Sequence, residues 1–80
     1  MNGLRVYMNA ERPETRCGRP VFYSRREDGP HYRWFYDEDQ RGWRAGRVLP
    51  SEVSPGMLAN APWKELPDGL QRSMIEHYQD

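Results

Sequence analysis

The chain has 80 residues and no net charge, because twelve basic side chains balance twelve acidic ones. A chain of this length forms one small domain, and its only cysteine, Cys17, excludes a disulfide framework and a cysteine-based zinc cluster. No apolar run approaches the roughly 20 residues of a membrane span, and the amino terminus has no signal-peptide pattern. We therefore expect a single cytoplasmic domain over residues 1–80 that does not contact a membrane.

Two segments of different character open the chain. Leu4, Val6 and Met8 recur at every second position, which predicts a short strand. Residues 9–20 contain two prolines, a glycine and five charged residues, a composition that favours an irregular loop. The first twenty residues thus predict one strand followed by one loop.

Three runs of strand-forming residues follow, joined by two short turns. The runs are residues 21–26, 31–37 and 43–48, and the middle run is rich in aromatic residues that favour the extended state. Asp28-Gly29 supplies turn chemistry between the first two, and an acidic turn ending in Gly42 joins the next two. Residues 4–50 therefore predict an antiparallel β-meander.

The remaining residues, 51–80, predict a helical carboxyl-terminal part. Short helical turns are expected at 51–53 and 54–58. A longer helix is expected through Tyr78, because Leu70, Met74 and Tyr78 share one face, with Trp63 anchoring its entry. The predicted fold is α+β, a three- to four-stranded antiparallel meander packed by a C-terminal helix.

The middle strand carries aromatic rings on both of its faces. Tyr32, Trp34 and Tyr36 point to one face, and Arg33 and Phe35 point to the other. One helix can cover only one face well. We expect the tyrosine–tryptophan triplet to be core and the face of Arg33 and Phe35 to meet a partner.

Interleaved arginines and rings are the most distinctive feature of the meander. They are the chemistry of protein interface hot spots and also of single-stranded nucleic-acid platforms. The alternative is that rings and arginine stems pack on one another within the sheet. The expected binding residues are Arg25, Arg33, Phe35, Trp43, Arg44 and Arg47.

Catalysis has weaker support in the sequence. Cys17 lies between Arg16 and Arg19, and nearby cations favour a reactive thiolate, but a catalytic thiol also needs a base, and the chain has only two histidines. The acidic residues at 37–39 lack the spacing of a calcium loop and are interpreted as a solvated turn paired with arginines. We expect no catalytic residues, no metal and no cofactor.

Two short resemblances to known families accompany these patterns. Trp43-Arg44-Ala45-Gly46-Arg47-Val48 resembles the Trp-x-x-Ala-x-Val strand of Tudor and other SH3-like small barrels, with the alanine one position earlier. That resemblance covers six residues and implies a small barrel that binds peptides through an aromatic cage. A three-stranded meander with tryptophans is also similar to a WW domain, but the tryptophan spacing and the closing Trp-x-x-Pro are absent.

The predicted function is a small non-enzymatic protein-binding module, since the charge is balanced, the sheet is aromatic and no catalytic set converges. An adaptor, an assembly factor or an inhibitor of a larger complex, such as one encoded by a phage or a bacterium, fits this description. The first alternative is single-stranded nucleic-acid binding by the same face. The second is an enzyme that uses Cys17. The oligomeric state is left open.

Overall fold

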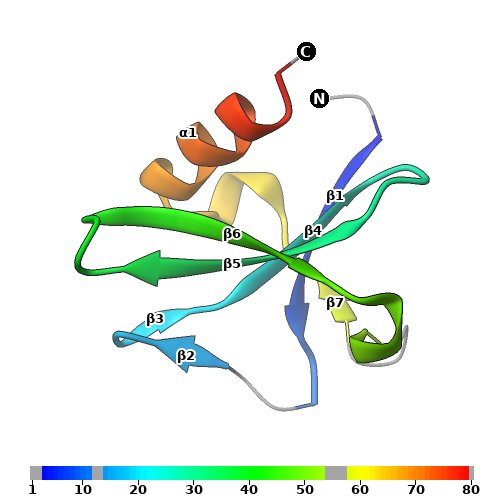
Figure 1. The fold of residues 1–80 in the computed structure, drawn as a ribbon, viewed down its shortest axis with the longest axis horizontal. Coiled ribbons are helices and arrows are strands. Elements are labelled where there is room, and N and C mark those ends of the chain that lie inside the picture. Colours follow the sequence, from blue (N-terminus) through cyan, green and yellow to red (C-terminus); the bar gives the residue numbers. More distant parts are fainter. Residues whose placement is uncertain (1–2, 12–13, 54–57, 80) are drawn as a thin grey trace.

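The structure is a computed structural model that describes residues 3–11, 14–53 and 58–79. A five-stranded antiparallel sheet has the strand order β6–β5–β4–β1–β7, and helix α1 lies across one of its faces (Figure 1). The fold class is α+β, as the sequence predicts. The strands are β1 (Leu4–Asn9), β4 (Phe22–Arg26), β5 (His31–Asp37), β6 (Gly42–Val48) and β7 (Leu58–Asn60).

The predicted meander is confirmed as β4, β5 and β6, which follow one another in the chain and in the sheet. Its register places Tyr23 opposite Arg33 and Trp34 opposite Ala45. The predicted first strand is β1, which pairs antiparallel with the free edge of β4, with Val6 opposite Ser24. No ladder joins β6 to β7 within the described residues, so the sheet is open rather than the closed barrel that the SH3-like resemblance implies.

The fifth strand was not predicted, because residues 51–80 were expected to be helical. Leu58–Asn60 forms β7, and Ala59 is opposite Met8 on the outer edge of β1. Three residues are too few for a period-two pattern, and the pairing depends on an edge that only the folded sheet provides. Most of the helical turn expected at 54–58 lies outside the described residues.

Another difference lies between β1 and β4, where an irregular loop was expected over residues 9–20. A two-stranded hairpin is present there, formed by β2 (Thr15–Arg16) and β3 (Arg19–Pro20). The two residues between them, Cys17 and Gly18, have φ angles of 53° and 75°. Positive φ at both central positions is the signature of a type I′ turn, whose twist suits a tight hairpin.

Two short helical turns and one longer helix follow β6 in the described part of the chain. Pro50–Glu52 (η1) and Trp63–Glu65 (η3) are single 3₁₀ turns, and the predicted long helix is α1, Asp68–His77. Within α1, Leu70 and Met74 are fully buried, as the i, i+4 spacing predicts. Trp63 packs partly buried against the same core, as expected of an anchor at the helix entry.

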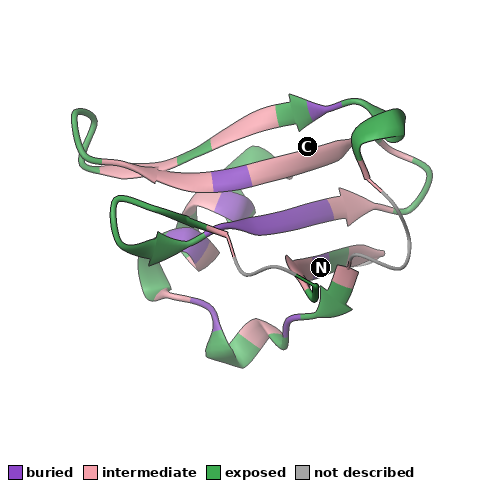
Figure 2. Cartoon of the chain, turned by 90° about the horizontal axis from the view of Figure 1, so that it is seen from below, coloured by how far each residue is buried: buried purple, intermediate pink, exposed green. Residues whose placement is uncertain are grey.

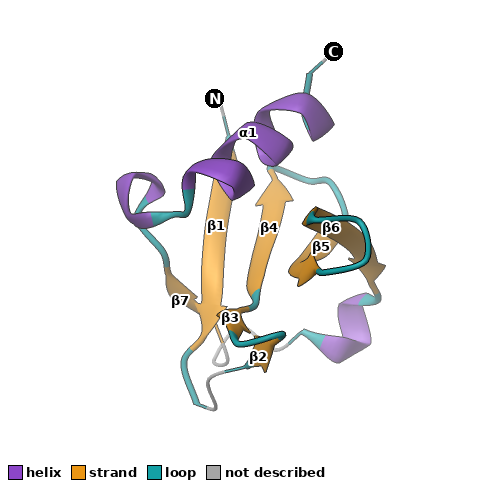
Figure 3. Cartoon of the chain, turned by 90° about the vertical axis from the view of Figure 1, so that its left-hand side faces the viewer, coloured by secondary structure: helices purple, strands orange, loops and turns teal. Residues whose placement is uncertain are grey.

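The main core lies between α1 and the sheet. In Figure 3, α1 passes over β1 and β4, while the β5–β6 pair is seen nearly end-on, so the sheet twists strongly beneath the helix. Val6, Phe22 and Trp34 face Leu70 and Met74 in this core. Of the triplet predicted to be core, Trp34 is 2% exposed and Tyr32 packs against the same cluster. Tyr36 belongs to neither apolar cluster of the described residues and instead packs against Trp43, with Arg19 over its ring.

A second, smaller apolar cluster lies on the other face of the sheet. Val21, Tyr23 and Val48 are buried there, and Tyr7 and Phe35 pack partly buried against them. Figure 2 shows buried residues along β4, the central strand of the five-stranded sheet, while the turns at the ends of the hairpins are exposed. The sheet is therefore apolar at its centre on both faces and polar toward its ends.

None of the described helices has both the length and the apolar character that crossing a membrane requires.

Candidate functional site

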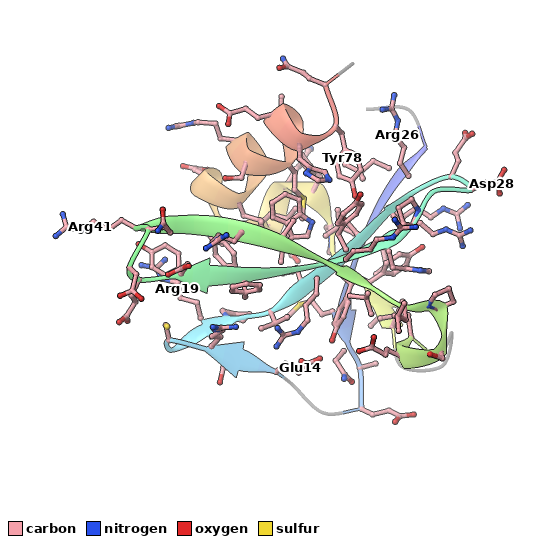
Figure 4. All side chains as sticks on the ribbon, viewed as in Figure 1. Glu14, Arg19, Arg26, Asp28, Arg41 and Tyr78 are labelled. Carbon is pink, nitrogen blue, oxygen red and sulfur yellow. The ribbon has the colours of Figure 1, made fainter. Side chains whose placement is uncertain are left out.

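The face of the sheet opposite α1 carries most of the expected binding residues, and we call it the open face. The open face is defined by the side chains that alternate away from the main core on β1, β4, β5 and β6. The β2–β3 hairpin flanks it at one end, where Figure 4 labels Glu14, and the β4–β5 turn with Asp28 is at the far end. Its members are Arg5, Tyr7, Tyr23, Arg25, His31, Arg33, Phe35, Arg44 and Val48.

A groove of three adjoining pockets crosses the open face. The first pocket, of about 380 Å³, lies over β1 and β4, and Arg25 lines both it and a second pocket of about 630 Å³. Arg47 and Val48 line both the second pocket and a third of about 350 Å³. The shared residues make the three pockets a continuous path from β1 to the edge strand β6.

A row of basic residues on adjacent strands runs along the first two pockets, and Glu27 and Asp28 also line the first. Arg5 is directly opposite Arg25, and Arg25 is directly opposite His31. Arg25 donates from Nε to the carbonyl oxygen of Gly29 at 3.0 Å. Within the described residues, neither Arg5 nor Arg25 forms an ion pair with a carboxylate. We call Arg5, Arg25 and His31 the basic row.

The basic row disfavours additional positive charge. Burial of the imidazole, and secondarily the neighbouring Arg25 guanidinium, lower the pKa of His31 below its ordinary value of 6.5. A histidine with a lowered pKa is neutral at pH 7 and presents one N–H donor and one acceptor. At neutral pH the row therefore holds two fixed charges and one neutral ring.

The third part of the groove is built around a carboxylate, Glu14. Its side chain accepts hydrogen bonds from the Tyr23 hydroxyl and from Asn9 Nδ2, and its Oε2 lies 3.3 Å from an Arg33 guanidinium nitrogen. Burial opposes ionisation of Glu14 most strongly, but the donors and the Arg33 charge together lower its pKa below 4.5. Burial, followed by the hydrogen bond to Glu14, raises the pKa of Tyr23. This cluster ties the segment before β2 to the sheet.

The β2–β3 hairpin covers the rings at its end of the sheet with arginines. The Arg16 guanidinium lies 4.3 Å from the centroid of Phe35, and Arg33 approaches the same ring at 5.7 Å. Arg19 lies 4.1 Å from the centroid of Tyr36. Arginines thus pack on rings within the fold here, which is the alternative that the sequence left open.

The structure brings four of the six expected binding residues together. Arg25, Arg33 and Phe35 belong to the open face, and Arg47 lines its groove from the β6 edge, although its Cα is opposite Tyr32. Arg44 is directly opposite Phe35 and shares its face, but it lines none of the three pockets and forms a 3.2 Å ion pair with Asp37.

Trp43 is separated from the other expected binding residues. It is opposite Tyr36, its ring packs against Phe22 at 6.1 Å between centroids, and it belongs to the periphery of the main core. A methyl group added at Gly69 would lie 3.5 Å from the indole, so the ring also supports the start of α1. Trp43 thus lies on the helix side of the sheet, away from the groove.

The residues weighed for catalysis and metal binding lie at two separate turns, the tip of the β2–β3 hairpin and the β5–β6 turn. Cys17 is a free, exposed thiol at the hairpin tip. The Asp37 carboxylate accepts backbone N–H bonds from Asp39 and Gln40 and pairs with Arg44, as expected of a solvated turn. Among the residues that the structure describes, no group of three potential metal ligands converges.

Three contributors to the groove were not singled out from the sequence. Arg5 and Glu14 come from the first strand and the expected loop, and only strand pairing brings them beside β4 and β5. Leu49 lines the second pocket and is 62% exposed, although it is apolar. In the sequence, Leu49 is an apolar residue between the end of a strand and a proline. Such a residue is equally typical of a buried position, so the pattern does not predict that Leu49 is exposed.

No protein-family model, no curated protein and no solved structure matches the chain.

Proposed function

We propose that this chain is a non-enzymatic protein-binding module whose docking surface is the groove on the open face. The groove carries the proposal: it crosses four strands and combines an exposed leucine with arginines, among them Arg5 and Arg25, that form no ion pair with a described carboxylate. Such a mixture of a forked cation and apolar area is typical of interface hot spots. An adaptor, an assembly factor or an inhibitor acting in the cytoplasm fits this surface.

Two exposed apolar residues provide a matched test of the docking surface. Leu49 is 62% exposed beside the groove, and Ile75 is 43% exposed on α1. Leu49→Glu places a charge in the groove, and Ile75→Glu places the same charge on the opposite side of the sheet. Neither substitution buries a charge, so both variants should keep the wild-type circular dichroism spectrum and thermal transition.

The experiment is affinity capture from native lysate with wild type and with both variants, read by quantitative mass spectrometry. We expect at least one protein that wild type and Ile75→Glu enrich equally and that Leu49→Glu loses by about tenfold, since a charge in a desolvated contact is strongly unfavourable. Equal recovery by all three proteins would remove the groove as the docking surface. Selective loss with Ile75→Glu would move that surface to α1.

Trp34 is unsuitable for testing the sheet as a docking surface, because its side chain lies in the core. Trp34 is 2% exposed and donates from Nε1 to Ser24 Oγ at 2.8 Å. Replacing it with alanine would damage the core, so loss of a partner would report unfolding. Surface residues beside the groove avoid this ambiguity.

Single-stranded nucleic-acid binding is the second candidate, because Arg5 and Arg25 are directly opposite each other and form no ion pair with a carboxylate that the structure describes. A nucleic-acid platform also needs exposed ring faces on which bases stack. Phe35, the expected open-face ring, already packs against Arg16. A gel shift with single-stranded oligonucleotides at low salt tests this candidate, and binding that weakens steeply as salt rises would support it.

A further inference from the structure

The position of the basic row is unusual for a sheet that has to be stable by itself. Like charges directly opposite on neighbouring strands are destabilising. The chain nevertheless places Arg5 opposite Arg25, although it has as many acidic side chains as basic ones. Glu27 and Asp28 line the same pocket, but no described ion pair links either carboxylate to the two arginines. The folded domain therefore leaves two guanidinium groups available for a carboxylate from elsewhere.

The geometry of the row suits an oxyanion. Side chains directly opposite on an antiparallel pair have Cβ atoms about 5 Å apart, so two long arginines can reach one carboxylate. A guanidinium binds a carboxylate through two parallel N–H donors, which gives direction as well as affinity. The neutral His31 beside Arg25 adds one N–H donor without adding repulsion.

The groove continues from the basic row into an apolar section and ends at a further arginine. The second pocket is lined by Arg25, Asp28 and His31 from β4, β5 and their turn, and by Arg47, Leu49 and Pro50 from the end of β6 and the residues after it. Arg47 forms no hydrogen bond or ion pair with any residue that the structure describes. An occupant of this groove thus meets the basic row, with Glu27 and Asp28 beside it, then the apolar surface at Leu49, and then Arg47.

We propose that the groove binds an extended acidic segment of a partner protein, with carboxylates at the basic row and at Arg47 and an apolar side chain between them against Leu49. The proposal rests on the proposed function and names the partner's chemistry. An extended segment fits because the path runs across four strands. The groove is lined by as many acidic as basic residues, so the preference for an acidic segment comes from Arg5, Arg25 and Arg47, which form no ion pair with a described carboxylate.

The test measures fluorescence anisotropy of labelled peptides with the full chain. The acidic probe carries aspartates and glutamates on both sides of one leucine, with glycine and serine elsewhere, and the neutral probe has glutamine in place of every acid. We expect the acidic probe to bind at least about tenfold more tightly than the neutral one, and to weaken between about 50 and about 300 mM salt. Equal binding of the two probes would overturn the proposal.

Charge-removing variants locate the site. Arg25→Gln removes the arginine that lines two of the pockets, and we expect it to weaken the acidic probe at least about tenfold. Arg72→Gln is the matched control, because Arg72 is exposed on α1 and makes no interaction with a described residue. We expect it to change affinity less than about twofold. An unchanged affinity of Arg25→Gln, with its fold verified by circular dichroism, would also overturn the proposal.

Two further measurements test for other occupants of the groove. If an oligothymidine binds more tightly than the acidic probe at matched salt, the groove takes nucleic acid and the proposal is wrong. If the chain dimerises in sedimentation experiments and Arg25→Gln abolishes the dimer, the occupant is a second copy, and the proposal is equally wrong. Loss of captured protein with Leu49→Glu but no preference for the acidic probe would leave the proposed function standing and reject the acidic partner.

Discussion

Ser24 is the residue on which the polar chemistry inside this core depends. It is 0% exposed, its Oγ accepts from Trp34 Nε1 at 2.8 Å, and it lies 2.6 Å from the Tyr78 hydroxyl. Tyr78 belongs to the end of α1, and its backbone carbonyl oxygen accepts a hydrogen bond from Arg26 of β4 at 3.1 Å (Figure 4). One hydroxyl on a central strand thus links the indole in the core to the last turn of the helix.

Ser24→Ala should destabilise the domain by about 1–3 kcal/mol, because it leaves the buried indole N–H without an acceptor. Tyr78→Phe should cost less, about 0.5–1.5 kcal/mol, since Trp34 keeps its bond to Ser24. Urea denaturation followed by tryptophan fluorescence measures both losses. The control is Ser73→Ala on α1, for which helix propensity predicts no loss. An equal effect of Ser24→Ala and Ser73→Ala would contradict this role for Ser24.

At the scale of elements, the β2–β3 hairpin depends on a turn whose first residue is poorly suited to it. Cys17 has φ 53°, a region that costs most side chains energy but that asparagine and glycine tolerate. Glycine already occupies the second position, with φ 75° at Gly18. Arg16 and Arg19, on either side of the turn, pack on rings of β5, so the hairpin is held by its contacts with the sheet.

Cys17→Asn should therefore stabilise the domain by about 0.5–1 kcal/mol, because asparagine adopts the left-handed conformation at lower cost. Cys17→Ser removes the thiol without that conformational preference and should change stability little. The shift in urea midpoint at constant m-value measures both effects. If serine and asparagine stabilise equally, loss of the thiol rather than the turn geometry is the cause.

For the whole molecule, the perturbed groups predict how stability depends on pH. The pKa values of Glu14 and Asp37 are lowered in the folded state, so the stability they contribute is present above about pH 4.5 and lost as pH falls further. The pKa of His31 is also lowered, which adds a loss of stability as pH falls below about 6.5, where the unfolded chain takes up that proton first. All three groups thus make acid destabilising.

Glu14→Gln should lower stability at pH 7 by about 1–2 kcal/mol, because it removes a charged acceptor from Tyr23 and Arg33. Between pH 5 and pH 3 the variant should lose less stability than wild type, because glutamine has no carboxylate to be protonated in that range. Urea midpoints at the three pH values test this prediction. Glu76→Gln, an exposed change on α1, should follow wild type, and parallel curves for all three proteins would exclude Glu14 as the titrating group.

Local patterns in the sequence are sufficient for the elements that carry their own signal. The β4–β5–β6 meander follows from strand-forming runs and turn residues, and α1 follows from the spacing of Leu70 and Met74. The core side of the middle strand follows as well, because alternation fixes which side chains share a face once one face is buried. The same alternation places Arg25, Arg33 and Phe35 on one face, whereas Arg47 lines the groove from the β6 edge although its Cα is opposite Tyr32.

Only the tertiary structure decided which surface is open and what it offers, because those properties depend on pairing between distant segments. β7 exists through the edge of β1, and the basic row exists because Arg5 meets Arg25 across a ladder that joins residues 4–7 to 23–26. Glu14 likewise acquires its partners across the fold, and Trp43 is drawn to the start of α1. The sequence by itself determined that rings and arginines share a sheet. Packing determined that most of the rings lie in or against the two apolar clusters, and that Arg5 and Arg25 meet without a carboxylate from the described residues.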